Sequence, residues 1–386
     1  MATYTVEEHL ATCRLTIDHA ALCDNWRKLD AATPGARTAS VVKANGYGLG
    51  MGDVAISLAA SGCEVFFVAN VDEGIRLRRT LKSREIFVFS GLTRRNAAAF
   101  AESNLIPVLN SLEDISVWAE FWNLRGSRRP CAVQLDTGMH RMGLSAADIA
   151  HFTNNKELAN SVNVITVLSH LACGDDHDHE MNQIQLERFQ AFSQHFKGSE
   201  LSLANSAGIY LGNSYHFNLV RPGIAIYGGE YFHTGENKMD VVVQAEARIV
   251  QIQDVKKGEV IGYGGTHVFN KDSKIATVSA GYADGYLRAG SSHPKGGANG
   301  AIGDIQVPVV GRISMDYTAF DVSDVPEQIL ESTKFVELFG HHIKLDDAAR
   351  GAGTLGYEFL TSIGQRYHRN HINQPEHSPG LYTSGQ

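Results

Sequence analysis

Over the first 230 residues, short apolar and β-branched runs alternate with longer segments in which apolar residues recur at helical spacing. We interpret eight of the short runs as strands: Thr38–Lys43, Val65–Asn70, Glu85–Ser90, Ile106–Asn110, Ala132–Asp136, Val164–His170, Leu201–Asn205 and Phe217–Arg221. Helices are expected between them, for example at Asp53–Ala60, Asp72–Leu81 and Glu180–Phe196. This order predicts a closed (β/α)8, TIM-like barrel, with an open doubly wound sheet as the alternative. The barrel is favoured because every run ends in a polar residue, and in a barrel these ends meet on one active face.

The pattern changes after about residue 236. Val241–Val255 alternates apolar and polar residues and leads into a Lys-Lys-Gly-Glu turn, which predicts a long strand. The other elements expected here are strands at Lys274–Ala280, Ile305–Val310, Tyr317–Val322 and Phe335–Leu338, a loop at Ser291–Gly300 and a helix at Glu358–Arg366. The chain is therefore expected to comprise a barrel over residues 12–235 and a mostly β domain over residues 236–386, with residues 1–11 associated with the second domain.

The amino-acid composition limits the binding partners and the cellular location that are expected for this protein. The 386 residues include 34 Lys+Arg and 42 Asp+Glu, a formal net charge of −8. This balance argues against nucleic acid and anionic membranes as partners, because both require a basic face. The five cysteines are widely spaced with no C-x-x-C, and Met1–Leu10 lacks the features of a secretory signal. We therefore expect a cytoplasmic protein with reduced thiols and no membrane span.

Three of the predicted strands end near side chains suited to chemistry. Lys43 follows an apolar run and precedes a glycine-rich turn, where a lysine either forms a Schiff base or pairs with a carboxylate. Asp136 and Arg141 flank a turn that either presents a carboxylate-binding arginine or is purely structural. His170 is a better candidate than the polar Asp175–His179 run, for which we expect no metal.

Other turns have more than one interpretation when taken singly. Ser206 follows the seventh predicted strand, and Arg221-Pro-Gly-Ile follows the eighth, where barrels often bind phosphate through backbone N–H groups. In the second domain Tyr263 lies among glycines, which allow close approach of a ligand or another backbone, although an interface residue is the alternative. Gly281–Tyr286 and Val310–Asp316 are similarly rich in turns and aromatic residues.

Together, these motifs resemble the alanine racemase family, pyridoxal 5′-phosphate (PLP) isomerases with an N-terminal barrel and a β-rich second domain. The matching motifs run in the family's order from Val41-Val42-Lys43 to Gly356-Tyr357-Glu358, nearly the whole chain. By this resemblance Lys43 is the lysine that binds PLP covalently and Tyr263 is the catalytic tyrosine, while Arg141 and the backbone N–H of Met315 bind the substrate carboxylate. The residues matching the remaining cofactor contacts are His170 and Arg221 at the ring, and Tyr47, Ser206, Gly223, Ile224 and Tyr357 at the phosphate.

The resemblance implies a two-base interconversion of L- and D-alanine. Lys43 would serve the D-alanine face and Tyr263 the L-alanine face. A tyrosine, with an ordinary pKa of about 10, needs positive or hydrogen-bond-donating neighbours to act as a base, and His170 and Arg221 are the expected source. In this family Tyr263 and Met315 reach the site from the partner subunit. The resemblance therefore implies a homodimer with shared sites, which makes D-alanine for peptidoglycan or degrades it.

One position departs from the family pattern. Many members carry a lysine, often carbamylated, two residues before the Asp of the Asp-Thr-Gly motif, where it orients the carboxylate-binding arginine. Gln134 stands there in this chain and cannot be carbamylated. We expect Arg141 to be oriented instead by the Gln134 amide, by Asp136 or by a bound anion.

Other functions deserve comparison. A racemase of broader scope, acting on serine or larger amino acids, would differ near Tyr357 and Met315. A non-catalytic PLP-binding homeostasis protein shares the barrel but lacks a second domain, so residues 236–386 and Tyr263 argue against it. A PLP decarboxylase of related architecture is disfavoured because its second-domain cysteine motif is not evident.

Overall fold

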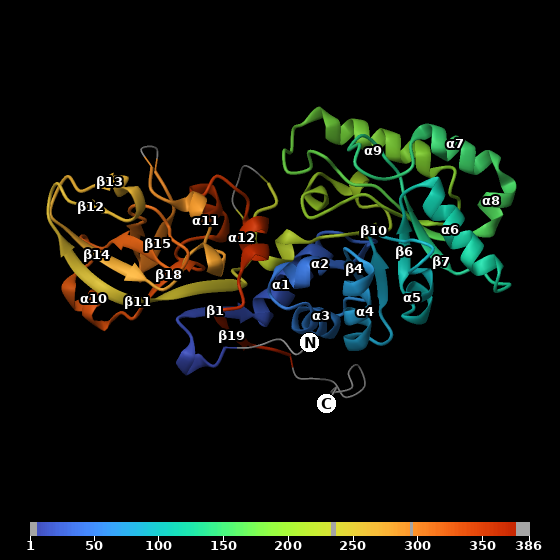
Figure 1. The fold of residues 1–386 in the computed structure, drawn as a ribbon. Coiled ribbons are helices and arrows are strands. Elements are labelled where there is room, and N and C mark those ends of the chain that lie inside the picture. Colours follow the sequence, from blue (N-terminus) through green and yellow to red (C-terminus); the bar gives the residue numbers. More distant parts are fainter. Residues whose placement is uncertain (1–5, 233–236, 294–295, 376–386) are drawn as a thin grey trace. The chain divides into compact units, whose positions relative to one another are not determined.

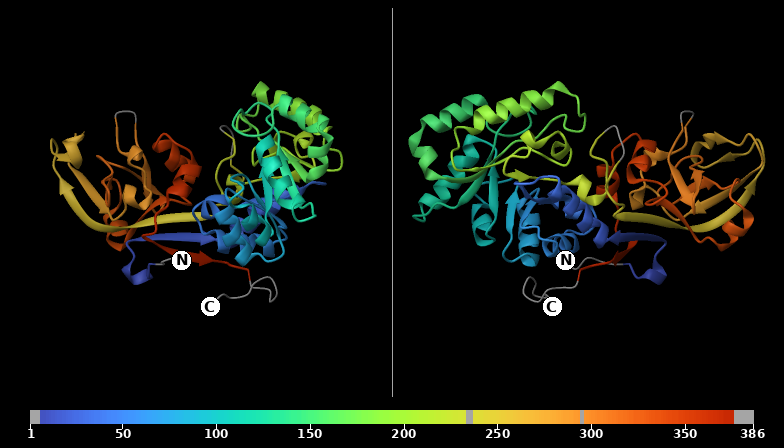
Figure 2. Two further views of the ribbon diagram at one scale, coloured as in Figure 1. Left: turned by 45° about the vertical axis from the view of Figure 1, so that its right-hand side comes forward. Right: turned by 180° about the vertical axis from the view of Figure 1, so that it is seen from behind.

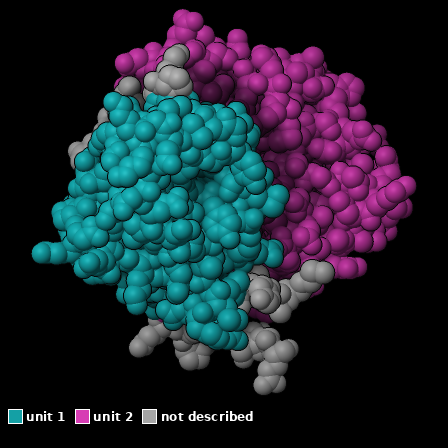
Figure 3. Space-filling model, turned by 60° about the vertical axis from the view of Figure 1, so that its left-hand side comes forward, with its two compact units in different colours: residues 1–21, 227–230, 239–374 teal, residues 22–226, 231–238, 375–386 magenta. Residues whose placement is uncertain are grey.

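The computed structural model describes residues 6–232, 237–293 and 296–375 (Figure 1). The chain divides into two compact units, which Figure 3 colours separately. Unit 2 is built mainly from residues 22–226, and unit 1 from residues 1–21, 227–230 and 239–374. The predicted domain boundary between residues 235 and 236 lies outside the described residues.

Unit 2 is a parallel barrel. Its described strands are β2 (Arg37–Thr38), β3 (Ser40–Val41), β4 (Val65–Val68), β5 (Glu85–Val88), β6 (Ile106–Leu109), β7 (Pro130–Gln134), β8 (Asn163–Leu168), β9 (Glu200–Ser202) and β10 (Leu219–Val220). Strands β3 to β9 form one parallel sheet in chain order, and β10 pairs in parallel with β2. The Asn218 and Arg221 amides donate to the carbonyls of Leu201 and Ala204, which joins β10 to β9. Because β2 and β3 are halves of one extended run, these bonds close the ring and exclude the open doubly wound sheet.

Helices alternate with these strands and lie outside the sheet (Figures 1 and 2). They are α1 (His19–Ala31, which begins in unit 1), α2 (Lys43–Tyr47), α3 (Met51–Ala60), α4 (Val71–Thr80), α5 (Ala97–Glu102), α6 (Leu112–Asn123), α7 (Ala146–Asn154), α8 (Lys156–Ser161) and α9 (Glu180–Ser193). Side-chain caps fix several starts: Asn70 accepts a hydrogen bond from the Glu73 amide, and Ser111 accepts one from the Asp114 amide. The three helices named from the sequence are confirmed within a few residues.

The barrel core explains the uninterrupted apolar runs of its strands. All four residues of β4 are buried, because a parallel strand is covered on both faces. Phe67 and Phe87 stack on neighbouring strands with ring centroids 4.7 Å apart. One detail of the prediction is wrong: β3 ends at Val41, and Lys43 is the first residue of the turn α2.

Unit 1 is mostly β, as the alternation predicted. Its strands are β1 (Cys13–Asp18), β11 (Val243–Val255), β12 (Val260–Ile261), β13 (His267–Val268), β14 (Ser273–Val278), β15 (Asn299–Ile302), β16 (Ile305–Pro308), β17 (Thr318–Asp321), β18 (Phe335–Phe339) and β19 (Tyr367–Ile372). The helices of this unit are α10 (Glu327–Ser332), α11 (Leu345–Gly351) and α12 (Gly356–Ser362). The long strand β11 organises the unit, since it pairs antiparallel with β1, β14 and β18.

Two predictions for unit 1 need correction. The predicted loop Ser291–Gly300 runs into β15, which begins at Asn299. The predicted helix Glu358–Arg366 stops at Ser362, because Ile363 is extended and the Gly364 amide donates to the Asp284 carbonyl instead of continuing the helix. Within the described ranges, no helix combines the length and apolar character needed to cross a bilayer.

Candidate functional site

A left-handed turn follows Lys43. The five consecutive residues Ala44–Gly48 all have positive φ, between 51° and 82°. A left-handed conformation costs about 1–2 kcal/mol for each residue that is not glycine, and three of these five are not. The surrounding structure stabilises the turn: the buried Glu73 carboxylate accepts hydrogen bonds from the amides of Asn45 (3.3 Å) and Ala69 (2.9 Å). Such strain is characteristic of functional sites, and here it reverses the chain directly after Lys43.

The pKa of Lys43 is lower than that of an ordinary lysine. Desolvation by the surrounding protein lowers the pKa of its ammonium, the nearby Arg141 lowers it further, and Glu73 opposes the shift. The side chain keeps contact with solvent, and its Nζ lies 5.9 Å from the centroid of the Phe89 ring. Among the described residues, no carboxylate lies within ion-pair distance of Nζ, so simple pairing does not account for this lysine.

Arg221 is buried at the ends of β8 and β9. Its side chain donates to Ser202 Oγ, to the Ser169 carbonyl at 2.5 Å and to the Leu203 carbonyl at 3.5 Å. Burial lowers the pKa of Arg221 to about 9, so the guanidinium still carries its charge at neutral pH. Its partners are neutral oxygens, and the arginine therefore delivers an uncompensated positive charge to the carboxyl-end face of the barrel.

A buried polar network supports Arg221, and the sequence interpretation missed it. Ser169 Oγ donates to the Leu135 carbonyl and also lies 2.8 Å from Thr137 Oγ1. Gln185 Nε2 donates to Thr137 Oγ1 (3.0 Å) and to the His170 carbonyl (2.9 Å). Ser169 directly precedes the candidate His170, but Gln185 lies within a helix and away from every motif; their hydrogen bonds and burial, at 1% and 0% exposure, show that they join the ends of strands β7 and β8.

His170 is neutral in this setting. Burial lowers its pKa to about 3, and the positive charges of Arg221, Arg141 and Lys43 add to the shift. The expectation that His170 and Arg221 act as a pair is therefore refined: Arg221 supplies the charge, while the imidazole can only donate or accept a hydrogen bond.

Four residues predicted to contact phosphate lie together. Ser206 Oγ accepts hydrogen bonds from the amides of Gly223 (2.9 Å) and Ala225 (3.4 Å). A Cβ on Gly223 would lie 2.3 Å from Tyr47 Oη, so only glycine leaves room for that hydroxyl. The buried Ile224 amide donates to no acceptor among the described residues. A hydroxyl-lined cradle with an unsatisfied N–H fits an anionic group such as a phosphate.

Arg141 has no orienting partner in the described part of the chain. Gln134 Nε2 donates to the Met142 carbonyl at 3.3 Å. Asp136 instead accepts from the amides of Gly138 and His140 and lies 3.0 Å from His140 Nδ1. Of the three expected partners of Arg141, Gln134 and Asp136 thus form their hydrogen bonds with other described residues, and orientation of the exposed guanidinium by a bound anion stays a prediction.

The candidates of unit 1 lie on exposed loops of that unit. Tyr263 starts a short 3-10 turn between Gly262 and Gly264, both with positive φ, and is 72% exposed. Met315 is 54% exposed, and its carbonyl accepts from the Ala283 amide at 3.1 Å. Tyr357 is partly exposed at the start of α12. Large apolar side chains placed this way are not core residues and are available for binding.

Ion pairs between the half-exposed Arg366 and two aspartates hold two of these loops, and no sequence motif indicated them. Arg366 donates to both oxygens of Asp284, at 2.7 and 2.9 Å, and to Asp316 at 2.7 Å. Asp284 belongs to the turn that packs on the Met315 carbonyl, and Asp316 follows Met315. Arg366 therefore fixes the backbone on both sides of the predicted substrate-binding N–H.

Comparison with known proteins agrees with this geometry. Residues 17–231 match the family model described as alanine racemase, N-terminal domain, and residues 242–371 match alanine racemase, C-terminal domain. The chain is 44% identical over 369 residues to an alanine racemase of Rhizobium meliloti (strain 1021), covering 94% of this chain and 97% of that protein. It is 40% identical over 375 residues to a catabolic alanine racemase of Agrobacterium fabrum, covering 97% and 95% of the two chains.

Solved structures are similar over the same span. Alanine racemase from Bartonella henselae, with covalently bound pyridoxal phosphate, has a TM-score of 0.87 at 34% identity, covering 94% of this chain and 100% of that chain. The biosynthetic alanine racemase from Pseudomonas aeruginosa has a TM-score of 0.86 at 30% identity, with coverage of 94% and 100%.

Proposed function

The chain belongs to the alanine racemase family of PLP-dependent enzymes, and we propose that it racemises alanine with Lys43 and Tyr263 as its two bases. The observation that carries the proposal is Lys43 itself. It is accessible, lacks a carboxylate partner among the described residues, and its pKa is lowered by desolvation and by Arg141. A lysine in this state can release and regain a proton near neutral pH more readily than an ordinary lysine.

The barrel residues fit the cofactor of the family. Lys43 would hold PLP covalently, Arg221 would face the ring nitrogen, and the Ser206–Ile224 cradle with Tyr47 would bind the phosphate. When bound, PLP stabilises the negative charge that remains on the α-carbon after its proton leaves. Because the pKa of Arg221 is about 9, the guanidinium keeps its proton at neutral pH and would not transfer it to the ring nitrogen.

The remaining residues bind and orient the substrate. Arg141 is exposed and would bind the alanine carboxylate, together with the backbone N–H of Met315. The neutral His170 would act as a hydrogen-bond partner rather than as a charge. Alanine is small, so these contacts with its carboxylate must supply much of the orientation that the reaction requires.

Tyr263 would serve the opposite face of the α-carbon from a partner subunit. Its exposure on the unit 1 surface supports this role, since a buried tyrosine could not enter another chain's site. We propose a homodimer in which residues 12–235 of one chain and residues 236–386 of the other complete each site, with Tyr357 as a further phosphate contact. Five free cysteines are consistent with the proposed cytoplasmic location.

Isotope exchange tests the two bases. Lys43→Ala should abolish both directions, whereas Tyr263→Phe should slow loss of the L-alanine α-proton to heavy water far more than loss of the D-alanine α-proton. Equal slowing in both directions by Tyr263→Phe would contradict the assignment.

Subunit mixing tests the shared site. Lys43→Ala and Tyr263→Phe chains, each inactive alone, should regain about one quarter of wild-type activity when dissociated together and reassembled, since half of the dimers would carry one intact site. No recovery, with mixed dimers present by native mass spectrometry, would show that both bases come from one chain.

A further inference from the structure

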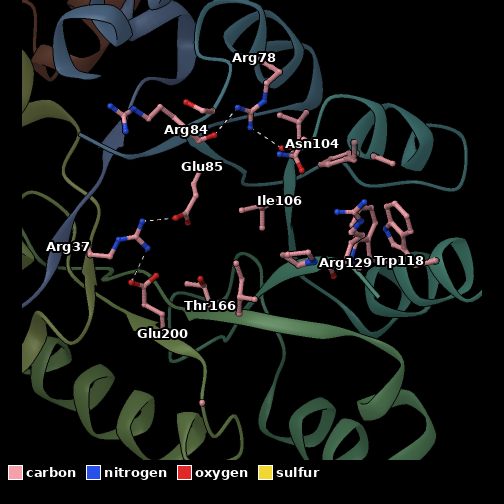
Figure 4. A pocket seen from close by; sticks show the side chains of 18 residues that line it. Arg37, Arg78, Arg84, Glu85, Asn104, Ile106, Trp118, Arg129, Thr166 and Glu200 are labelled. Carbon is pink, nitrogen blue, oxygen red and sulfur yellow. Dashed lines mark hydrogen bonds and ion pairs between the residues drawn. The ribbon is translucent and has the colours of Figure 1, made fainter. Parts of the chain in front are cut away.

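The barrel of unit 2 carries a second concave site, at the amino ends of its strands. A cavity of about 770 Å³ opens there among the first residues of four strands: Arg37, Glu85, Ile106 and Glu200 (Figure 4). Lys43 and Arg221 follow the carboxyl ends of their strands. A strand of four to six residues, such as β4 or β8, spans about 13–20 Å, so the two sites are distinct. The volume is typical of a pocket for a small organic molecule.

The carboxylates of this cavity are already neutralised. Arg37 donates to Glu85 at 2.7 Å and to Glu200 at 3.4 Å, and Figure 4 shows the three side chains together on one side. Each glutamate therefore contributes little free negative charge to a ligand in the cavity.

Three further arginines leave a positive excess. Arg78 donates to backbone carbonyls, including those of Ser103 and Asn104, and no carboxylate pairs with it in the described ranges. In the part of the chain that the structure describes, Arg84 pairs with the largely exposed Glu64 at 3.2 Å, and its buried Nε has no acceptor. Arg129 has no carboxylate partner among the described residues. Four arginines against two glutamates line the cavity, so its field favours an anion.

An aromatic wall lies opposite Arg37. Trp118 packs edge-on against Phe100 and Trp122, with ring centroids 6.3 and 5.7 Å apart. The Arg129 guanidinium carbon lies 5.3 Å from the centroid of the Trp122 ring, and Trp118 Nε1 donates to the Arg129 carbonyl. Figure 4 shows Arg129 and Trp118 side by side on this wall. Phe100 and Trp118 are buried, so the part of this wall that a ligand can reach is the partly exposed Trp122 with the Arg129 cation beside it.

We propose that this cavity binds a small organic anion with a planar aromatic body. The ring would lie against the partly exposed Trp122, and the acidic group would be bound by Arg129 beside it. An inorganic anion would leave the aromatic surface unused, and a neutral aromatic molecule would leave the cations unpaired. The site does not depend on the proposed bases, because it lies on the opposite end of the barrel.

Calorimetric titration of the holoenzyme with sodium 2-naphthoate tests the proposal. Two comparison ligands test the two parts of the molecule separately: 2-naphthamide has the ring system without the negative charge, and acetate has the negative charge without the ring system. Arg129→Gln should weaken 2-naphthoate binding about tenfold, the effect expected on losing one charge-assisted hydrogen bond. Arg125→Gln is the matched control, since Arg125 also lies over an aromatic ring (Phe121, 3.8 Å) but does not line the cavity.

Binding of 2-naphthoate to the Arg141→Gln variant shows whether the ligand occupies this cavity or the substrate site. We expect 2-naphthoate to bind more tightly than either comparison ligand, with its affinity unchanged in Arg125→Gln and in Arg141→Gln. The proposal is overturned if 2-naphthoate does not bind at millimolar concentration, or if 2-naphthamide or acetate binds equally well. It is equally overturned if Arg129→Gln binds like the wild type, or if Arg141→Gln rather than Arg129→Gln abolishes binding.

Discussion

Arg221 and Arg37, at opposite ends of the barrel, differ in how their charge is compensated. At the carboxyl end, Arg221 is buried, its hydrogen-bond partners among the described residues are neutral oxygens, and its charge helps to lower the pKa of His170. At the amino end, Arg37 is bound by two glutamates, and those contacts outweigh burial and raise its pKa. Arg221 therefore presents an unpaired cation to the carboxyl-end face, whereas Arg37 is used in ion pairs with residues of neighbouring strands. Unpaired arginines occur at both ends, because Arg78 and Arg129 have no carboxylate partner among the described residues, so compensation has to be judged for each arginine rather than for each end.

Replacing Lys43 should have the largest effect. Lys43→Ala removes both the covalent anchor and one proposed base, and we expect racemisation to fall by at least about 10³-fold. In the wild type, the rate should rise with pH as Lys43 loses its proton, with an inflection below the ordinary lysine value of 10.5, because the pKa is lowered in the folded protein. Steady-state rates across pH would show this, and an inflection at or above 10.5 would contradict it.

Arg221→Gln should have the next largest effect. It removes the unpaired charge of the carboxyl end and leaves Ser202 and the Ser169 carbonyl without their donor, so we expect about a 100-fold loss of kcat and about 2 kcal/mol of stability. The pKa of His170 should rise, because one of the cations that lowers it is gone. NMR titration of the imidazole measures the shift, and an unchanged His170 pKa would show that Arg221 does not contribute to it.

Arg366→Lys tests a paired arginine that serves the predicted substrate loop in unit 1. A lysine keeps the charge but cannot bind Asp284 through two parallel bonds, so the Met315 loop should loosen and kcat/KM fall about tenfold. Arg350→Lys is the control, since Arg350 pairs with Glu230 and Asp347 in the same unit. A similar fall in kcat/KM in both variants would show that the effect comes from a general loss of stability and not from the Met315 loop.

Arg37→Gln should have the smallest effect and leave kcat within about twofold of wild type. The pairs with Glu85 and Glu200 are part-exposed and screened, so the loss of stability should be about 0.5–1 kcal/mol. Burial already raises the pKa of Glu200, and loss of Arg37 raises it further. A raised carboxyl pKa disfavours the folded state as pH rises, so the loss should be greater at pH 7 than at pH 4. Arg94→Gln, which breaks a surface pair with Glu120, is the control for urea unfolding.

Much of the fold could be predicted from short stretches of the sequence. The continuous apolar run at Val65–Val68 predicted a parallel strand that is covered on both faces. The alternation of apolar and polar residues along β11 predicted a strand with one exposed face. The helix starts at Asn70 and Ser111 likewise depend on local sequence, because each side chain caps an amide only three residues further along the chain. The end of β3 was misplaced by two residues, because the left-handed turn after Lys43 depends on Glu73 from another element.

The sequence by itself determined the order of elements, the family resemblance and the identity of the candidate residues, since each rests on patterns a few residues long. Only the tertiary structure decided how those residues behave. Arg366 and Asp284 are 82 positions apart, and Arg221 meets Ser169 across 52. Whether an arginine is paired, or a histidine charged, depends on such distant neighbours and on burial, because both electrostatic interaction and desolvation are set by distance in space rather than along the chain.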